Sequence, residues 1–349
     1  MKQSCFIAMS GGIDSSVCLY LLKQQGLDVK GLTLRLDDEY EGPIKKAKML
    51  CDKFGLEHIV LDYREIFKEK IIKTFNQQVL SGITPVPCVA CNRFIKLGLL
   101  VEFCQAHDAK LATGHYAVIR ECNNANGHER CIFKAKDVLK DQTHFLCSVK
   151  KEYLQDIVFP LGDMFKSEVF RIARDNNLVD IAGYKESQEV CFFNNRTYAE
   201  YVKSLNISEK RCEIRHVRTG EKLGECRGLL KYTIGQRQGI GVAWSEPLYV
   251  VKKDFQNNVL FVGEENCLYS NVFKVQKINI IANDYINKEQ FECEVCLRDK
   301  TPMVSAVVYR QSNGEAQVKL KGKARAITSG QICAFYDDNM LLGGGEIVV

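Results

Sequence analysis

The chain begins with a string of residues suited to binding phosphate. Residues 10–16 read Ser-Gly-Gly-Ile-Asp-Ser-Ser and follow the apolar run at residues 5–9. The apolar run predicts a short buried strand, and the residues after the string have the apolar spacing of a helix. Glycines let the backbone approach a ligand closely, and the free N–H groups at a helix N-terminus attract anions. The string therefore predicts a phosphate-binding turn, with an ordinary capped glycine turn as the alternative.

Other phosphate-binding motifs do not account for this string. The Walker motif is absent, and Gly239-Ile240-Gly241 lacks both the third glycine and the preceding strand of a dinucleotide fold. Residues 10–16 resemble instead the pyrophosphate-binding loop of the ATP pyrophosphatases. This resemblance implies that ATP is cleaved between its α and β phosphates to adenylate a carbonyl or carboxyl oxygen. Asp14 would either cap the helix or hold a metal ion for the phosphates.

Two cysteine-bearing segments have residues suited to sulfur or metal chemistry. Cys88 and Cys91 form a C-x-x-C pair in a proline-stiffened loop, and Asn92 is expected to cap the helix that follows. A thiol at a helix N-terminus has a lowered pKa and is reactive at neutral pH. The pair is compatible with a redox dithiol, half of a metal site, or chance in a chain with 16 cysteines. Cys191 lies in a polar turn before two phenylalanines, where a cysteine by itself is expected to belong to the core.

The first half of the chain alternates strand and helix patterns, which predicts a parallel sheet with crossover helices. Ligands bind such sheets beyond the carboxyl ends of the strands, which is where the turn at residues 10–16 falls. The expected strands are residues 5–8, 29–36, 58–61 and 110–113, and the expected helices are residues 15–25, 43–55, 64–81, 92–107, 150–158, 163–177 and 195–204.

After about residue 205 the pattern changes to short, alternating apolar segments separated by turn residues. This predicts a small mixed domain followed by a β-barrel or sandwich. The expected strands are residues 248–251, 259–262, 291–297, 305–309, 316–320 and 332–336. We predict three domains, which cover residues 1–204, 205–267 and 268–349, the last of them a β-barrel.

Size, charge and cysteine content restrict the class of protein. A chain of 349 residues is expected to form two or three domains. The net charge of +5 permits nucleic-acid binding without requiring it. The apolar run at residues 5–9 is too short for a signal peptide, and nothing approaches 18 apolar residues, so no membrane span is expected. The cysteines then indicate free thiols in a reducing cytosol rather than a disulfide scaffold, and hence a cytoplasmic protein.

Several motifs, in order along the chain, resemble those of the bacterial tRNA-specific 2-thiouridylases. They lie at residues 8–15, 84–96, 112–116, 140–142, 187–192, 230–241 and 342–345, so that the similarity spans essentially the whole chain. Members of this family replace O2 of the wobble uridine with sulfur in tRNAs for Lys, Glu and Gln. The resemblance implies an α/β ATP-pyrophosphatase domain like the adenine nucleotide α-hydrolases, a small central domain and a C-terminal, tRNA-contacting β-barrel.

The resemblance also implies roles for particular residues. ATP, with Mg²⁺ near Asp14, would be bound by Ala8, Met9, Ser10, Gly11, Gly12, Ile13, Asp14, Ser15, Leu34 and Gly114. The tRNA would contact Val86, Pro87, Cys88, His115, Lys140, Asp141, Gln142, Arg298 and Gln331. The protein is expected to act as a monomer.

Two cysteines would carry the sulfur in this family. Cys191 corresponds to the thiol that carries a persulfide, delivered by a sulfur-relay protein or a cysteine desulfurase. Cys91 corresponds to the nucleophile that frees the sulfur and closes a transient disulfide with Cys191. Adenylation turns the uracil oxygen into a good leaving group, a sulfur nucleophile attacks C2, and the second thiol reduces the persulfide bond.

The sequence departs from the family pattern at two places. Val86-Pro87-Cys88 stands where the family commonly has Asn-Pro-Asp, and residues 187–192 read Ser-Gln-Glu-Val-Cys-Phe where Ser-Thr-Gly-Ile-Cys-Phe is frequent. The first departure puts an essential Asp in doubt. It also raises the hypothesis that Cys88, Cys91 and Cys191 form a three-thiolate corner for an iron–sulfur cluster, with one iron open to carry sulfide.

Two other functions compete with this interpretation. Another adenylating enzyme of the same loop class, making an amide or guanidino group, would lack the paired thiols and the motifs at residues 140–142 and 235–237. A non-enzymatic tRNA-binding or sulfur-carrier protein would leave the pyrophosphate loop without a purpose.

Overall fold

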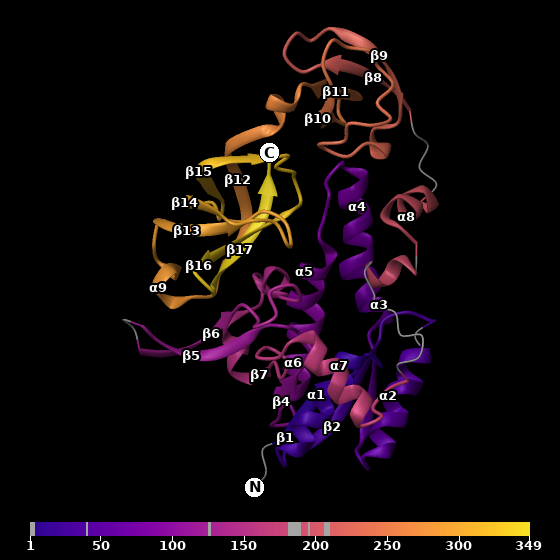
Figure 1. Ribbon diagram of the computed structural model, residues 1–349, viewed down its shortest axis with the longest axis vertical. Coiled ribbons are helices and arrows are strands. Elements are labelled where there is room, and N and C mark those ends of the chain that lie inside the picture. The colour runs from indigo at the N-terminus through magenta and orange to yellow at the C-terminus, as the bar shows by residue number, and fades with distance from the viewer. Residues whose placement is uncertain (1–3, 40, 125–126, 181–189, 195, 206–209) are drawn as a thin grey trace.

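The N-terminal part of the chain forms a five-stranded parallel sheet in the order β3-β2-β1-β4-β7. The computed structural model describes all residues except 1–3, 40, 125–126, 181–189, 195 and 206–209 (Figure 1). The strands of this sheet are β1 (Ser4–Ala8), β2 (Asp28–Arg35), β3 (His58–Asp62), β4 (Lys110–Ala112) and β7 (Ile157–Val158). The predicted parallel sheet is confirmed, and its first four strands lie where the sequence predicts them.

Helices cover both faces of this sheet, because successive side chains of a strand point to opposite faces. Cys5 and Ile7 of β1 belong to one buried cluster, with residues of α1, α2 and α7, whereas Phe6 belongs to a second cluster with α4, α5 and α6. These helices are α1 (Ile13–Gln24), α2 (Glu41–Lys53), α3 (Arg64–Phe67), α4 (Thr74–Leu80), α5 (Pro87–Cys91), α6 (Leu100–Gln105) and α7 (Lys166–Asp175). Two π-helical segments, η1 (Lys68–Lys73) and η2 (Asn92–Leu99), join α3 to α4 and α5 to α6.

The segment at residues 150–158 is not the single helix that the sequence predicts. It forms a short 3₁₀ helix, η4 (Lys151–Asp156), and then the edge strand β7, which pairs with β4. Periodicity alone does not separate so short a buried strand from a helix, so the prediction was wrong at this edge. The remaining short helices of this part are η3 (Thr143–Leu146), η5 (Cys191–Phe193) and α8 (Tyr198–Ser204).

A hairpin from the first half of the chain joins the C-terminal sheet. β5 (Val118–Asn124) and β6 (Gly127–Phe133) pair with each other, and β6 pairs with β17 through Phe133 and Met340. This hairpin is not among the strands that the sequence predicts. It fastens the parallel-sheet region to the C-terminal part of the molecule, as Figure 1 shows.

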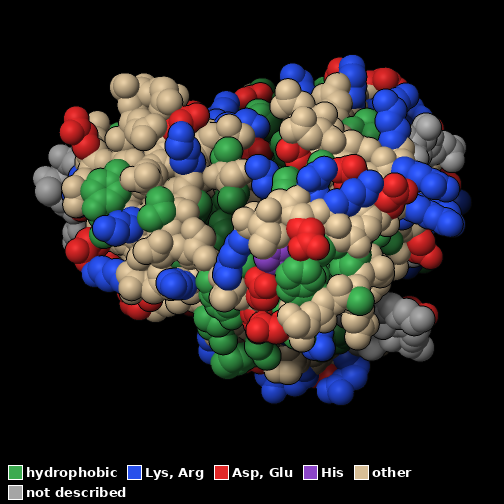
Figure 2. Space-filling model, turned by 90° about the horizontal axis from the view of Figure 1, so that it is seen from above, with side chains coloured by type: hydrophobic (Ala, Val, Ile, Leu, Met, Phe, Trp, Pro, Cys, Tyr) green, Lys and Arg blue, Asp and Glu red, His purple; other side chains and the backbone are tan. Residues whose placement is uncertain are grey.

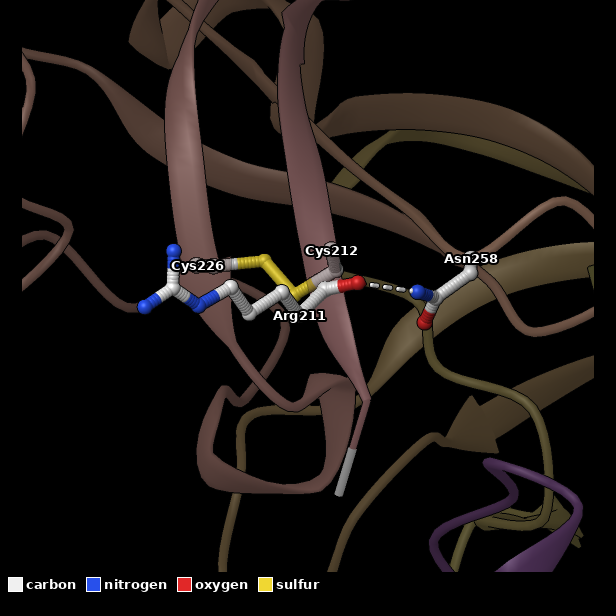
Figure 3. The surroundings of a disulfide bond; sticks show 4 residues. All are labelled: Arg211, Cys212, Cys226 and Asn258. Atoms are coloured by element: carbon white, nitrogen blue, oxygen red, sulfur yellow. Dashed lines mark hydrogen bonds between the residues drawn. A yellow bond between two sulfur atoms is a disulfide. The ribbon is translucent and has the colours of Figure 1, made fainter.

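The central part of the chain forms a four-stranded sheet in the order β10-β11-β8-β9 with a hydrophobic core of its own. Its elements are β8 (Arg211–His216), β9 (Lys222–Arg227), η6 (Leu229–Lys231), β10 (Tyr249–Asp254), β11 (Val259–Gly263) and η7 (Glu265–Leu268). Cys212 and Cys226 face each other across β8 and β9 and form a disulfide (Figure 3). The sequence predicts free thiols rather than a disulfide scaffold, and this pair is an exception, because the register of the hairpin brings the two sulfurs together.

The C-terminal part is a closed six-stranded β-barrel in the order β12-β15-β14-β13-β16-β17, because β12 also pairs with β17. Its elements are β12 (Tyr269–Ile280), α9 (Asn283–Ile286), β13 (Gln290–Cys296), β14 (Val304–Arg310), β15 (Ala316–Arg325), β16 (Ile332–Asp337) and β17 (Met340–Val348). The predicted β-barrel is confirmed, although the sequence did not indicate β12 and β17. The domain limits at residues 204 and 267 remain predictions. Among the described residues, no helix is long and apolar enough to cross a membrane.

Candidate functional site

The turn at residues 10–16 connects β1 to α1, as the sequence predicts. Gly12 precedes the first residue of α1 and has no side chain with which to cap the helix. The hydroxyls of Ser15 and Ser16 both donate to the carbonyl of Gly12, at 3.1 and 2.9 Å, and the Ser10 amide donates to the Ser15 hydroxyl at 3.2 Å. The serines thus hold the turn in shape. The first N–H groups of α1 have no intrahelical partners and are available to an anion.

Two glycines of the site lie in close contact with neighbouring residues. Gly11 has a positive φ of 71°, and a Cβ there would lie 2.8 Å from the carbonyl oxygen of Pro43 on α2. A Cβ on Gly114 would lie 3.3 Å from the amide nitrogen of Ser15. Gly11 therefore fits the turn against α2, and Gly114 leaves the N-terminus of α1 open.

Asp14 does not cap α1 and instead belongs to a partly buried ion pair. Lys166, at the start of α7, places its ammonium 2.6 and 2.8 Å from the two carboxylate oxygens of Asp14. The Tyr116 hydroxyl donates to the same carboxylate at 2.9 Å. The Lys166 side chain is 8% exposed, which leaves it little access to solvent. The local sequence indicates neither Lys166 nor Tyr116 as a site residue, because they lie 152 and 102 residues from Asp14 along the chain.

A cavity of about 230 Å³ opens beside the turn, at the carboxyl end of β1, β2 and β4. Alternate residues of β2 and the loop that follows it, namely Leu32, Leu34 and Leu36, form an apolar wall of this cavity. Of the residues predicted to bind ATP, Ala8, Met9, Ser10, Asp14, Ser15, Leu34 and Gly114 line it. The side chain of Ile13 is fully buried in the core, so only its backbone is available to a ligand. The cavity therefore has one apolar wall and one end rich in hydrogen-bond donors.

His115 and Gln142 also line the cavity. The His115 ring bonds to the Thr113 hydroxyl at 2.7 Å, and burial, with a contribution from Lys96, lowers the pKa of His115 to about 3. His115 is therefore neutral at physiological pH. Gln142 accepts a hydrogen bond from the Tyr116 amide at 3.1 Å, so it fixes the chain beside His115.

The three thiols of the site come from two segments of the chain. Cys88 and Cys91 lie on α5, and Cys191 begins η5. Cys88 and Cys191 are exposed, whereas Cys91 is buried. Cys91 and Phe192, the residue after Cys191, belong to the same buried cluster, so the two segments pack near each other. The negative charges of Cys191 and Cys88 raise the pKa of Cys91, in agreement with this packing. All three are free thiols, and the predicted disulfide between Cys91 and Cys191 remains a prediction.

The environment of the thiols differs from the predicted one. Burial, followed by smaller electrostatic effects, raises the pKa of Cys91 to about 11 and also raises the pKa values of Cys88 and Cys191. The lowered pKa expected for a thiol at a helix N-terminus is therefore wrong. The helix begins earlier than predicted, at Pro87, and Cys91 lies at the end of α5. Asn92 does not cap a helix but donates to the carbonyl of Phe145 at 3.0 Å.

The described residues offer no ready metal site. No group of three or more His, Cys, Asp or Glu side chains among them is arranged to hold a metal ion. The structure thus gives no support to an iron–sulfur corner at Cys88, Cys91 and Cys191. Both oxygens of the Asp14 carboxylate already accept hydrogen bonds from Lys166, so Asp14 does not present a free ligand for Mg²⁺ either.

The predicted tRNA-contacting residues fall into two groups around the site. Lys140, Asp141 and Gln142 lie between β6 and η3, and Asp141 accepts a hydrogen bond from the Thr143 hydroxyl at 2.6 Å. The Lys134 ammonium, just after β6, donates to the sulfur of Met303 at 3.0 Å, which places the connection between β13 and β14 near this loop. Arg298 is exposed in that connection.

Gln331 lies beside the segment that carries Val86, Pro87 and Cys88. Its side-chain amide donates to the carbonyl of Thr84 at 3.0 Å, and the Thr84 amide donates to the carbonyl of Ser329 at 3.0 Å. The barrel therefore holds the segment that leads into α5. The predicted RNA contact at Gln331 is not tested by this geometry, because the side chain already bonds within the protein.

The surface seen from above the view of Figure 1 carries scattered charge. On this face, Lys and Arg side chains are interspersed with Asp and Glu rather than gathered into one basic groove (Figure 2). The described residues of this face therefore do not mark an RNA path by charge alone.

The site combines a glycine- and serine-rich turn after the first strand of a parallel sheet with a cavity that has an apolar wall. These features are typical of a nucleotide-binding α/β protein of the ATP-pyrophosphatase class. Sequence comparison agrees and is more specific. Residues 3–195 match the family described as the tRNA methyl transferase HUP domain, residues 200–264 its PRC-barrel domain, and residues 270–347 the aminomethyltransferase β-barrel domain.

Curated relatives match over nearly the whole chain. The tRNA-specific 2-thiouridylase MnmA of Rickettsia prowazekii is 38% identical over 98% of this chain and 97% of its own length. The protein of the same name from Rickettsia felis is 38% identical over 99% of this chain and 97% of its own length. The chain therefore belongs to the family of tRNA-specific 2-thiouridylases.

Solved structures match less closely. The NMN synthetase of Francisella tularensis is 18% identical, with a TM-score of 0.37, over 59% of this chain and 77% of its own. A likeness at this level carries no argument about the site.

Proposed function

We propose that this chain catalyses the ATP-dependent 2-thiolation of the wobble uridine of tRNA, in the tRNAs for Lys, Glu and Gln. The observation that carries the proposal is the joining of two half-sites. Lys96 and His115 line the cavity beside the phosphate turn, and Lys96 lies on η2, which continues directly from the helix α5 that carries Cys88 and Cys91. A nucleotide and a sulfur nucleophile can therefore meet at one edge of the sheet.

In the first step, the cavity binds ATP and the uracil O2 attacks the α phosphate. The β and γ phosphates would lie against the N–H groups at the start of α1, and the adenine against Leu34 and its neighbours on β2. Pyrophosphate leaves, and the uridine becomes an O2-adenylate. Donors that are already in position stabilise the charge that develops on the phosphates, because they need no rearrangement during the reaction.

In the second step, the terminal sulfur of a Cys191 persulfide attacks C2 and AMP leaves with the former O2. The Cys91 thiolate then attacks the Cys191 sulfur, which breaks the S–S bond and leaves the second sulfur on C2 as 2-thiouridine. The products are AMP, pyrophosphate and a Cys91–Cys191 disulfide. An external dithiol must return two electrons to this disulfide, and a sulfur-relay protein or cysteine desulfurase must reload Cys191.

Mg²⁺ would reach the site with ATP, and its chemistry would be to neutralise phosphate charge. The protein side of such a site does not fit well, since Asp14 is bound by Lys166 and Tyr116. An iron–sulfur cluster has no fitting donor set among the described residues. We therefore assign no step to either.

The tRNA would reach the site along the loops that carry residues 86–88, 115 and 140–142, with Arg298 and Gln331 of the barrel at the margins. We also propose that the protein acts as a monomer in the cytoplasm, with domain limits near residues 204 and 267.

Nucleoside mass spectrometry tests the proposed function. Digested tRNA from cells that contain the protein should yield 2-thiouridine derivatives, and tRNA from cells that lack it should yield the oxygen forms. Equal 2-thiouridine content in the two samples would contradict the proposal. Pyrophosphate exchange into ATP in the absence of tRNA would favour another adenylating enzyme.

A further inference from the structure

Lys96 lies where the nucleotide cavity meets the thiols. It lines the cavity together with Ser10 and Asp14, and it is exposed to solvent there. The positive charge of Lys96 opposes the rise in pKa of the site thiols, of which Cys91 is the most deeply buried. No role for Lys96 follows from the motifs of the sequence, although it ends the segment at residues 84–96.

The π-helical segment η2 brings Lys96 toward Cys91. In an α-helix, two residues five positions apart lie about 140° apart around the axis, on nearly opposite sides. Over η2 the hydrogen bonds run from residue i+5 to residue i, as the Leu100 amide does to the Ile95 carbonyl. The wider turn places residues five apart on nearly the same side. Lys96 can therefore share the face of the helix that carries Cys91.

Gly98 permits this wide turn. A Cβ on Gly98 would lie 2.6 Å from the carbonyl oxygen of Arg93, five residues earlier. Leu97, just before it, has a non-helical conformation with φ −120° and ψ 16°. Because a side chain at position 98 would force the turn to open or shift, the glycine is part of the arrangement that positions Lys96.

Among the described residues, His115, His144 and Arg93 do not supply a positive charge to the thiols. Burial lowers the pKa of His115 to about 3 and of His144 to about 4, so both are neutral at physiological pH. Arg93 donates to the Asn279 side chain at 3.3 Å and so points toward the barrel. The charge of Asp37 raises the pKa of Cys191, and Asp14, which lines the cavity, is paired with Lys166.

We propose that Lys96 is a positioning residue that stabilises the anionic sulfurs of the site, and that the glycine-dependent π-helical turn exists to bring its charge there. This proposal rests on the proposed function and deepens it. A sulfur nucleophile must be an anion to attack C2, yet it lies beside a nucleotide that is itself an anion. The positive charge of Lys96 would stabilise both the sulfur anion and the phosphates of the nucleotide.

Thiol alkylation tests the role of Lys96 without tRNA or ATP. The full chain is treated with iodoacetamide between pH 6 and pH 10, and the modification of the exposed Cys88 and Cys191 is followed by peptide mass spectrometry. Lys96→Met should slow alkylation at pH 7.5 roughly threefold to tenfold, because a shift of one pKa unit changes the thiolate fraction tenfold. Lys96→Arg should restore most of the rate.

Two further variants make the test specific. Lys73→Met removes an exposed lysine of η1 that pairs with Glu69, and it should leave the alkylation profile unchanged. Gly98→Ala keeps the charge of Lys96 but crowds the turn, and it should shift the profile in the same direction as Lys96→Met by a smaller amount. High salt should narrow the difference between wild type and Lys96→Met, because salt screens an exposed charge.

The outcomes separate the two proposals. A wild-type profile for Lys96→Met, or a Lys96→Arg profile as slow as that of Lys96→Met, would overturn the role of the charge. A wild-type profile for Gly98→Ala would overturn the role of the turn. Wild-type protein that fails to thiolate tRNA would overturn the proposed function, and a slowed Lys96→Met would still support the charge on the thiols.

Discussion

The two halves of the site differ in how far the fold has completed them. On the nucleotide side, the polar side chains already have partners within the protein: the Ser15 hydroxyl donates to the backbone carbonyl of Gly12, and Lys166 donates to Asp14. On the sulfur side, Cys88, Cys91 and Cys191 are free thiols with raised pKa values. The nucleotide side is thus held by hydrogen bonds within the protein, whereas the three cysteines of the sulfur side are mostly in the protonated thiol form at neutral pH.

The disulfide of the central sheet can be compared with the cysteines of the sulfur side. Cys212 and Cys226 are bonded and buried across a hairpin, 14 residues apart in sequence. Cys91 and Cys191 are 100 residues apart and belong to different elements, so no local register fixes their separation. A hairpin can hold a disulfide permanently, whereas a pair from two segments can open and close.

The largest expected effect comes from removing the sulfur carrier. Cys191→Ala should lower tRNA thiolation by roughly a hundredfold or more, because it removes the proposed nucleophile, while ATP binding remains. The measurement is 2-thiouridine formed per minute at saturating ATP. Cys267→Ala, at a half-buried cysteine of the central part, is the matched control and should retain activity. Normal thiolation by Cys191→Ala would contradict the proposed role of Cys191 as the sulfur carrier.

A smaller loss is expected on the nucleotide side. Lys166→Met leaves the Asp14 carboxylate without its cation, so we expect a roughly tenfold to hundredfold fall in kcat/KM for ATP. Unfolding by urea should show a loss of about 2 kcal/mol, less than for a fully buried pair because Asp14 is 30% exposed.

A double-mutant cycle sharpens that prediction. Adding Asp14→Asn to Lys166→Met should cost less stability than the sum of the two single changes, because the unpaired charge disappears. Strict additivity of the two changes would show that the ion pair does not hold the pocket together.

The pH dependence should distinguish the two halves. Burial raises the pKa of Cys91 to about 11, so its nucleophilic thiolate is scarce at neutral pH and grows about tenfold for each pH unit. Single-turnover release of sulfur from loaded Cys191 should therefore speed up steadily from pH 7 to pH 9. A rate that levels off below pH 8 would contradict the raised pKa of Cys91.

The smallest effect on activity is expected at the disulfide. Cys212→Ser combined with Cys226→Ser should leave thiolation unchanged, because the central sheet holds neither half of the site. It should lower the free energy of unfolding by about 3 kcal/mol, as expected for a closed loop of this length. Urea unfolding checks the stability, and a loss of thiolation in the folded variant would link the hairpin to the site.

The sequence predicted the nucleotide side well because its signal is local. Residues 10–16 contain the strand end, the turn and the helix start in one string, and the strand and helix periods around them are long enough to detect. The partner of Asp14 was missed, since nothing in the local pattern of Lys166 indicates that α7 returns to α1. The barrel was predicted, but not the hairpin β5–β6 that joins it to the first half.

The sulfur side was predicted only through the family resemblance. Neither C-x-x-C nor Cys191 alone indicates a shared site, because their meeting depends on the tertiary fold. Local reasoning also gave the wrong sign for the thiol pKa values, because it placed the helix start after Cys91 and ignored burial. The π-helical turn at Gly98 has no sequence signal that periodicity can detect.

The central claim is that one site couples ATP cleavage to sulfur transfer on tRNA. Purified wild-type protein, loaded with persulfide and given tRNA and ATP in a single turnover, should form one AMP, one pyrophosphate and one 2-thiouridine, with a Cys91–Cys191 disulfide found by peptide mass spectrometry. Omitting the tRNA should abolish pyrophosphate release. Pyrophosphate released without tRNA, or 2-thiouridine formed without AMP, would contradict the account.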